Sequence, residues 1–180
     1  MEYVNPIKDL KKIRDLKKII KNKSSRDYLL FIMGINTGLR IGELLSLKIG
    51  SVIDENRNLH TFLLIKEQAV YLNENVRKAV KHFFRLDLPP LDHYLFRSSR
   101  GDRPITRQQA YRILNQAAAE VGIDEKVGTH TLRKTFGYHA FVKGIAISLI
   151  QERFHQATPG ETFKYIGIEK TETQKLDVNL

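Results

Sequence analysis

The segment from Thr37 to Leu47 (TGLRIGELLSL) places a permanently charged side chain next to buried structure. Arg40 follows an almost wholly apolar stretch and Gly38, where an unpaired guanidinium is costly. A guanidinium suits phosphate because its planar fork can donate two parallel hydrogen bonds. Arg40 is therefore a candidate phosphate ligand, and the alternative is an internal ion pair with Glu43, three residues later.

A second segment, HTLRKTF at 130–136, combines a titratable side chain with another arginine. Thr129 is the expected N-cap of a helix, so His130 and Arg133 lie three residues apart on one face of its first turn. Free backbone N–H groups and the helix dipole favour an anion at such a terminus. The pair predicts a phosphate site with a titratable group attached. The alternative is a histidine packed near a cap, with the arginine extending into solvent.

The third segment, ETFKYIGI at 161–168, ends a short expected helix that carries Tyr165. This helix begins with the capping-box spacing of Thr158 and Glu161, and Pro159 takes its first position. Taken alone, Tyr165 is most simply a core residue whose hydroxyl reaches water.

The elements that must position these residues are mostly helices. Apolar residues recur at helical spacing over most of the chain, whereas short runs of β-forming residues begin near position 60. Asn73 is the expected N-cap of one helix. The sequence thus predicts a mainly α fold with a small antiparallel sheet: helices at 8–21, 26–36, 40–47, 73–86, 106–121, 129–143 and 146–154, a last helix near 158, a turn at 22–25, and strands at 60–65, 69–72 and 94–96.

Composition narrows the class of partner. Lys and Arg number 30 against 20 Asp and Glu, and the net charge of +10 favours a polyanion such as nucleic acid. A basic, solvated surface that binds no polyanion is the alternative. The chain has no Cys, which excludes disulfides and thiolate metal sites and fits a cytoplasmic location. No apolar run reaches the roughly 18 residues that span a membrane, and no secretory signal is visible.

Taken together and in this order, Arg40, His130, Arg133 and Tyr165 resemble the motif of the tyrosine recombinase (phage integrase) family. The spacing is also similar, with 90 residues from Arg40 to His130 and 32 from Arg133 to Tyr165. The resemblance covers residues 5 to 168 and implies the fold of a recombinase catalytic core.

The resemblance implies covalent chemistry on DNA without a metal or a cofactor. Tyr165 would attack a backbone phosphate, form a 3′-phosphotyrosyl link and free a 5′-hydroxyl. Arg40 and Arg133 would stabilise the charge on the phosphate oxygens, and His130 would assist proton transfer from the tyrosine. Such an enzyme would recombine or integrate DNA at specific sites, as the recombinases of mobile elements do.

The position of the general acid departs from the family pattern. In the family a lysine on a β-hairpin protonates the leaving oxygen, and Lys66 lies where that lysine is expected. Only Glu67 and Gln68 separate it from the next apolar stretch, so the hairpin is shorter than usual. Either Lys66 acts from a tight turn, or the family lysine is missing from the chain and Lys66 is an ordinary surface residue.

A second departure lies nine positions before the tyrosine, where the family has His or Trp. This chain has Gln156 there, with His155 just before it, and either side chain could fill the role. Glu43 is expected to orient Arg40 or a neighbouring donor.

The expected partner is double-stranded DNA, bound by a protein that is monomeric when free and tetrameric in the recombining complex. Contacts to backbone phosphates are expected from a basic loop, from the helix after it and from a lysine beside the second arginine of the motif: Arg97, Arg100, Arg103, Arg107, Arg112 and Lys134.

The chain is expected to form one catalytic domain over residues 1–180. Residues 1–7 form a leader, and the tail at 169–180 can be mobile or exchanged with a neighbouring subunit. The N-terminal core-binding domain usual in the family is expected to be absent. Two other functions stay open: a non-catalytic DNA-binding protein that keeps the fold, and a relaxing enzyme similar to type IB topoisomerases.

Overall fold

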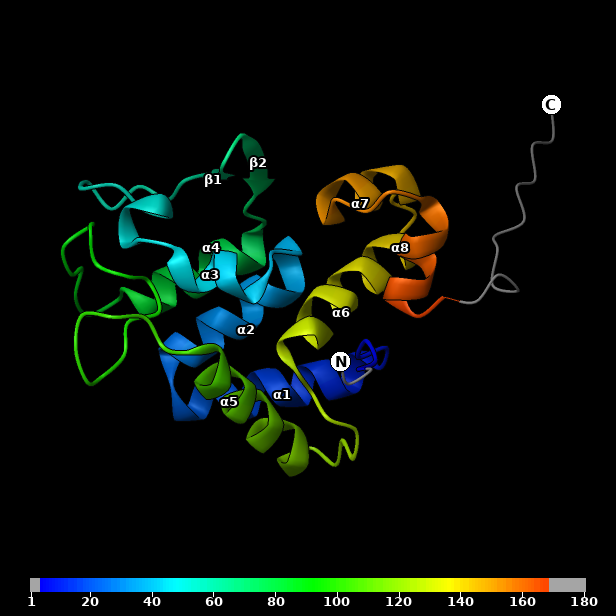
Figure 1. Ribbon diagram of the computed structural model, residues 1–180. Coiled ribbons are helices and arrows are strands. Elements are labelled where there is room, and N and C mark those ends of the chain that lie inside the picture. Colours follow the sequence, from blue (N-terminus) through cyan, green and yellow to red (C-terminus); the bar gives the residue numbers. More distant parts are fainter. Residues whose placement is uncertain (1–3, 169–180) are drawn as a thin grey trace.

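The computed structural model describes residues 4–168, so the predicted tail at 169–180 and the first residues of the leader lie outside the described residues. Helices dominate, and the sheet is a two-stranded antiparallel hairpin, which confirms the predicted fold class (Figure 1). In chain order the elements are α1 (Leu10–Lys23), α2 (Ser25–Thr37), α3 (Ile41–Ser46), η1 (Ile49–Ser51), β1 (Phe62–Ile65), β2 (Gln68–Tyr71), α4 (Glu74–Phe83), α5 (Arg107–Glu120), α6 (Thr129–Val142), α7 (Ile147–Phe154) and α8 (Pro159–Ile166).

Helix α2 is the centre of the main hydrophobic core. Its residues from Leu29 to Gly34 are buried, as the apolar run in the sequence predicted, and it packs against α1, α4 and α6. A stretch this apolar cannot remain at the surface, so the amphipathic helices cover it.

A second, smaller core lies under α7 and α8. Ile150, Phe154, Ile166 and Ile168 are buried there, and Phe136 of α6 packs against them. Helix α6 therefore runs from the main core to the second core, and Figure 1 shows it between the larger group of helices and the α7–α8 pair. The arrangement places the start of α6 near both groups.

Two of the predicted helix caps are confirmed, one of them with an adjustment. The Asn73 side chain accepts from the N–H of Val76, and Thr158 accepts from the N–H of Glu161, as predicted. The Glu161 carboxylate reaches one residue further back than a capping box requires, to the N–H of Ala157.

The prediction of Thr129 as the N-cap of α6 is wrong by one residue. Gly128 takes that position in an extended conformation, and Thr129 is the first helical residue. The hydroxyl of Thr131 accepts the N–H of Gly128 at 3.0 Å, which closes the terminus from inside the helix.

Two other local predictions are also wrong. Tyr94 to Phe96 is not a strand, because Tyr94 forms only an isolated bridge with Lys48. The segment is apolar because Leu95 and Phe96 are buried in the core. The turn at 22–25 shrinks to Ser24, whose N–H donates to Ile20 at the end of α1 while its hydroxyl caps α2.

The hairpin turn is as tight as the sequence predicted. Ile65 pairs with Gln68, so the loop consists of Lys66 and Glu67 alone. Leu63 is buried against the core, whereas Leu64 is 73% exposed. One face of the hairpin thus packs against the core, and Lys66 lies at the hairpin tip.

Gly137 of α6 offers a test of the contact between the two cores. A Cβ there would lie 2.5 Å from Ile166 Cγ2 and 2.8 Å from Phe154 Cε2. We expect Gly137→Ala to lower the free energy of unfolding by about 1–3 kcal/mol, because a packed helix contact cannot take the extra atom. Urea denaturation measures the effect.

Gly160→Ala is the matched control, because its Cβ would meet only Thr158 Oγ1, at 3.9 Å. Alanine is the better helix former by about 1 kcal/mol, so this variant should be unchanged or more stable. Equal stability of the two variants would contradict the packing described above.

Candidate active site

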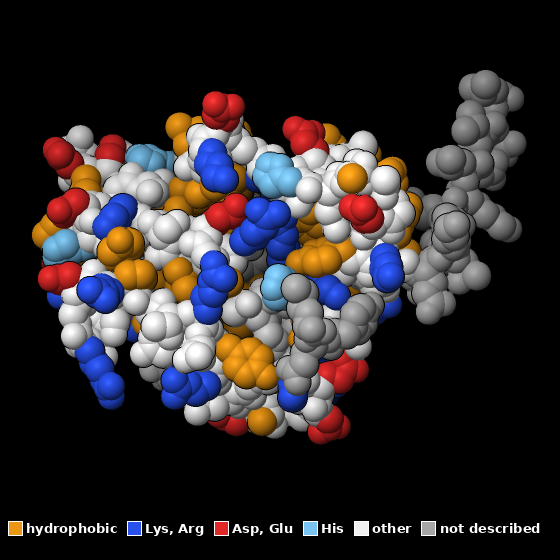
Figure 2. Space-filling model, viewed as in Figure 1, with side chains coloured by type: hydrophobic (Ala, Val, Ile, Leu, Met, Phe, Trp, Pro, Cys, Tyr) orange, Lys and Arg blue, Asp and Glu red, His pale blue; other side chains and the backbone are white. Residues whose placement is uncertain are grey.

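One pocket brings together the residues that the sequence grouped by their chemistry. It has a volume of about 530 Å³ and lies where the hairpin turn and the starts of α3, α5 and α6 meet the α7–α8 pair. Figure 2 shows Lys, Arg and His side chains gathered near the middle of this face of the molecule. The lining consists of Arg40, Ile41, Gly42, Glu43, Lys66, Arg107, Thr129, His130, Arg133, Phe154, His155, Gln156 and Tyr165.

Arg133 is the buried member of the set, with only 5% of its surface exposed. Its Nη1 donates to the carbonyl of Gly38 at 2.6 Å, and its Nη2 donates to the carbonyl of Arg153 at 3.4 Å. The guanidinium also lies 4.4 Å from the ring centre of Phe154, within range of a cation–π interaction. Burial lowers its pKa, although an arginine remains charged in proteins.

Gly38 shapes the backbone that holds Arg133. It ends α2 with a φ of 68°, the left-handed conformation that glycine adopts most easily. A Cβ at this position would also lie 2.5 Å from the ring of Phe136. The glycine thus permits both the sharp exit from α2 and the close approach of α6.

Arg40 lines the pocket as an exposed residue and forms the N-cap of α3. The carboxylate of Glu43 accepts the backbone N–H of Arg40 at 2.7 Å. Within residues 4–168 no ion pair joins the two side chains, so the internal salt bridge considered for Arg40 does not form. Glu43 fixes the backbone of Arg40 and leaves the guanidinium to the pocket.

Tyr165 and His130 are in direct contact. The tyrosine hydroxyl lies 3.4 Å from Nδ1 of His130, and it can donate there when that nitrogen carries no proton. Burial raises the pKa of Tyr165, while the charges of Arg133 and Arg40 act in the opposite direction. Burial lowers the pKa of His130, and the nearby charges of Lys134, Arg133, Arg107 and Arg40 lower it further. A protonated phenol therefore faces a neutral imidazole at neutral pH.

Three further members of the predicted set also line the pocket. Lys66 is exposed at the hairpin tip with a φ of 54°, and His155 ends α7 with a φ of 51°. The amide of Gln156 donates weakly to the carbonyl of Glu161 at 3.5 Å. Its buried Oε1 has no hydrogen-bond partner among the described residues. Both Gln156 and His155 remain candidates for the position that precedes the tyrosine by nine residues.

Arg107 belongs to the pocket as well as to the predicted DNA-contacting set. It is the first residue of α5, and its guanidinium passes so close to Gly42 that a Cβ there would lie 2.8 Å from Nη2. Arg112 lines a shallow hollow that adjoins Arg107 and Thr129. Sequence reasoning placed Arg107 on the DNA backbone and did not foresee a third arginine beside the reactive groups.

The other residues predicted to contact DNA differ from one another in their exposure and in their hydrogen-bond partners. Arg97 is engaged within its own loop, since it pairs with Asp102 at 2.9 Å and donates to the carbonyl of Gly101. Arg100 and Arg103 are exposed on that loop. Lys134 is only 6% exposed, and its ammonium lies 5.2 Å from the ring centre of Tyr165 rather than at the surface.

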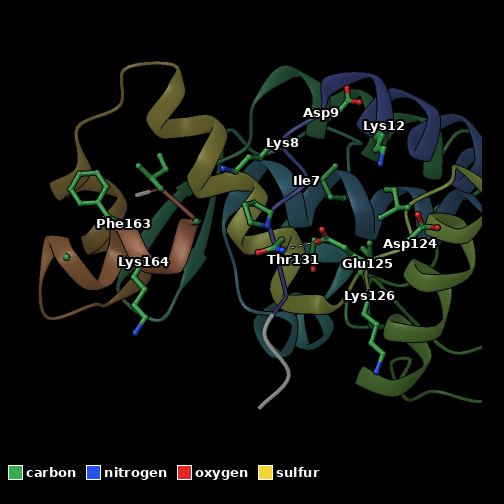
Figure 3. Close-up of a pocket in the computed structure, with 17 residues that line it drawn as sticks. Ile7, Lys8, Asp9, Lys12, Asp124, Glu125, Lys126, Thr131, Phe163 and Lys164 are labelled. Carbon is green, nitrogen blue, oxygen red and sulfur yellow. Dashed lines mark hydrogen bonds between the residues drawn. The ribbon is translucent and has the colours of Figure 1, made fainter. Parts of the chain in front are cut away.

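A larger cavity, of about 1150 Å³, lies apart from the predicted catalytic residues. Figure 3 shows its lining from the chain before α1, the α5–α6 loop, α6 and α8. Lysines such as Lys8 and Lys164 alternate there with carboxylates such as Asp9 and Asp124. This cavity was not predicted from the sequence, because its walls come from segments far apart in the chain.

Two further properties hold for residues 4–168. No helix in this range is both long and apolar enough to cross a bilayer. No group of three or more His, Asp or Glu side chains in it is arranged to hold a metal ion.

Sequence comparisons connect the chain to proteins that act on DNA. Residues 8–172 match the model of the phage integrase family. The chain is 39% identical to "Probable integrase/recombinase YoeC" of Bacillus subtilis, over 97% of this chain and 95% of that protein. It is 30% identical to the tyrosine recombinase XerD of Corynebacterium glutamicum, over 79% of this chain and 48% of that protein. The chain thus spans about half the length of this Xer relative.

Structural comparisons give the same fold. The crystal structure of XerA recombinase superposes with a TM-score of 0.75 at 24% identity, over 94% of this chain and 63% of that one. XerH site-specific recombinase bound to its palindromic difH substrate superposes with a TM-score of 0.70 at 21% identity, over 94% of this chain and 50% of that one.

The histidine of the pocket can be tested by its titration. We expect the imidazole of His130 to titrate below the usual midpoint of about 6.5, because burial and neighbouring cations both oppose its protonation. Lys134→Met removes the neighbouring charge with the largest effect and should raise the midpoint. NMR of labelled histidine measures both values.

Lys18→Met is the control, because Lys18 is exposed on α1, and it should leave the midpoint unchanged. A midpoint for His130 at or above the usual value in the unsubstituted protein would contradict this account of the pocket.

Proposed function

The chain belongs to the phage integrase family of tyrosine recombinases, enzymes that break and rejoin DNA, and we propose that it recombines DNA at specific sites through a covalent bond to Tyr165. The observation that carries this proposal is the contact of 3.4 Å between the Tyr165 hydroxyl and His130 in a pocket that also holds Arg40 and Arg133. A nucleophile, a base and two guanidinium groups are the parts that phosphoryl transfer to tyrosine needs.

In the proposed first step the Tyr165 oxygen attacks the phosphorus of a DNA phosphodiester. The new bond joins tyrosine to the 3′-phosphate, and the bond from phosphorus to the 5′-oxygen breaks. His130 accepts the phenolic proton, because a neutral imidazole within hydrogen-bond distance can act as a general base. The reverse sequence, with a 5′-hydroxyl as the nucleophile, rejoins the strand.

Arg40 and Arg133 stabilise the charge that develops on the non-bridging oxygens. The buried Arg133 is held by two backbone carbonyls, so it is already oriented before DNA arrives. Arg40 is exposed and lines the same pocket, with its backbone fixed by Glu43. Arg107 adds a third guanidinium, which we assign to the same phosphate or to the adjacent one on the strand.

Lys66 is proposed as the acid that gives a proton to the departing 5′-oxygen. It lines the pocket from the hairpin tip. Gln156 or His155 contributes a further hydrogen bond to the phosphate. The scheme uses no metal, because the guanidinium groups stabilise the negative charge on the phosphate oxygens.

The proposed substrate is double-stranded DNA, in keeping with the net charge of +10. Exposed Arg100, Arg103 and Arg112 would contact backbone phosphates outside the pocket. We propose that the protein is monomeric when free and that four copies assemble on two DNA sites, because exchange of strands requires two duplexes to be cut.

Covalent capture of DNA tests the function. The protein is mixed with a pool of nicked duplexes of random sequence, in which the cut strand loses a short fragment that diffuses away. We expect an SDS-resistant adduct with duplexes that share a sequence, and we expect Tyr165→Phe to reduce the adduct by at least about 10³-fold, because it removes the attacking oxygen. Gel electrophoresis and sequencing of the captured DNA measure the result.

Tyr138→Phe is the matched control, since this tyrosine lies on α6 outside the pocket and should leave the adduct intact. Sequence-specific binding without any adduct would contradict the proposal and favour a non-catalytic DNA-binding protein. Relaxation of plasmid DNA without sequence preference would instead favour a topoisomerase-like enzyme.

A further inference from the structure

The side chain of Arg153, in the last turn of α7, joins that helix to the hairpin that carries Lys66. Its Nη2 donates to the carbonyl of Ala69 at 3.3 Å, and its Nη1 donates to Oε1 of Gln68 at 3.4 Å. Its own carbonyl accepts a hydrogen bond from Nη2 of Arg133 at 3.4 Å. One residue therefore contacts both the hairpin and the buried arginine of the pocket.

The hairpin needs such support at its tip. Lys66 has a φ of 54°, a left-handed conformation that is unfavourable for a residue with a Cβ and that glycine usually takes in a two-residue turn. An isolated two-stranded hairpin is marginally stable in water. Here Leu63 and Val70 anchor it on one face, while Leu64 and Tyr71 on the other face are exposed. The contacts of Arg153 begin at Gln68, two residues after Lys66.

An arginine fits this task better than any other side chain. Its rigid fork can satisfy an amide oxygen and a backbone carbonyl at the same time, whereas a lysine offers a single centre of charge. Arg153 is half-buried, and so is its bond to Gln68, so water competes less for that bond than for one at the surface. Because α7 is fixed by the second core through Ile150 and Phe154, the hairpin is tied to the same frame as Tyr165.

We infer that Arg153 is a positioning residue for Lys66, which fixes the hairpin turn so that the lysine ammonium faces the leaving 5′-oxygen. This inference rests on the proposed strand cleavage. In that step the bond from phosphorus to the 5′-oxygen breaks, the oxygen keeps the electron pair, and it takes a proton from Lys66. The lysine is left neutral until the returning 5′-hydroxyl gives the proton back during rejoining.

A change of leaving atom separates this role from a general structural one. The duplexes recovered by covalent capture are made in two forms, with oxygen or with sulfur as the 5′-bridging atom of the cleaved phosphate. A thiolate leaves without a proton because a thiol is far more acidic than an alcohol. Substitution of any residue that acts through the general acid should therefore slow cleavage of the oxygen substrate and not of the sulfur substrate.

On the oxygen substrate we expect Arg153→Met to slow single-turnover cleavage about tenfold, and Lys66→Ala about 100-fold or more. On the sulfur substrate both variants should cleave within about threefold of the unsubstituted protein, since the step they serve is no longer needed. Gln68→Ala removes one acceptor without touching Arg133, and it should show the same pattern with a smaller loss.

Arg14→Met is the control, because it removes one positive charge from the exposed side of α1 and should change neither rate. Thermal melting checks that each variant is folded. If Arg153→Met is not folded, the rates of Gln68→Ala on the two substrates test the inference instead. An equal loss on both substrates would overturn the inference and leave the proposed function intact. If the unsubstituted protein forms no adduct with either substrate, the proposed function fails and the inference with it.

Discussion

The hydrogen bond of 2.6 Å from Arg133 to the carbonyl of Gly38 joins the parts of the molecule on which the pocket depends. It connects the start of α6 to the exit from α2, so the two arginine-bearing segments of the sequence meet although 95 residues separate the bonded pair. A buried guanidinium is tolerated only when its donors are satisfied, and here two carbonyls and an aromatic face surround it. The fold thus holds a charge in its interior at the proposed phosphate-binding site.

The second core fixes the position of Tyr165 relative to Arg133. Phe154 lies under the guanidinium of Arg133 and also contacts the ring of Tyr165, with centres 5.4 Å apart. Gly137 lets α8 approach α6 closely enough for Ile166 to fill the space beside that phenylalanine. The position of the tyrosine therefore follows from apolar packing, and the hydrogen bond to His130 adjusts its hydroxyl within a site that packing has already fixed.

Periodicity and caps were sufficient to predict most elements, because helices such as α1 and α4 carry both an apolar stripe and a capping side chain. Tyr94 to Phe96 misled the prediction because buried loop residues have the same composition as a strand. The four motif residues could be grouped because their order and spacing resemble those of the tyrosine recombinase family. The bonds of Arg153 to Gln68 and Ala69 could not, since a single arginine at a helix end has many possible partners and only the fold selects one.

The charges in the pocket also act on one another. Arg40, Arg107, Arg133 and Lys134 all disfavour a proton on His130, and Glu43 already uses one carboxylate oxygen for the backbone of Arg40. A phosphodiester that enters the pocket brings a negative charge, which offsets part of this repulsion and raises the proton affinity of the imidazole. In the proposed mechanism His130 would therefore be a stronger base when the phosphate is in place. Because the same cations would stabilise the attacked phosphate, the mechanism couples binding of DNA and activation of the tyrosine through one set of charges.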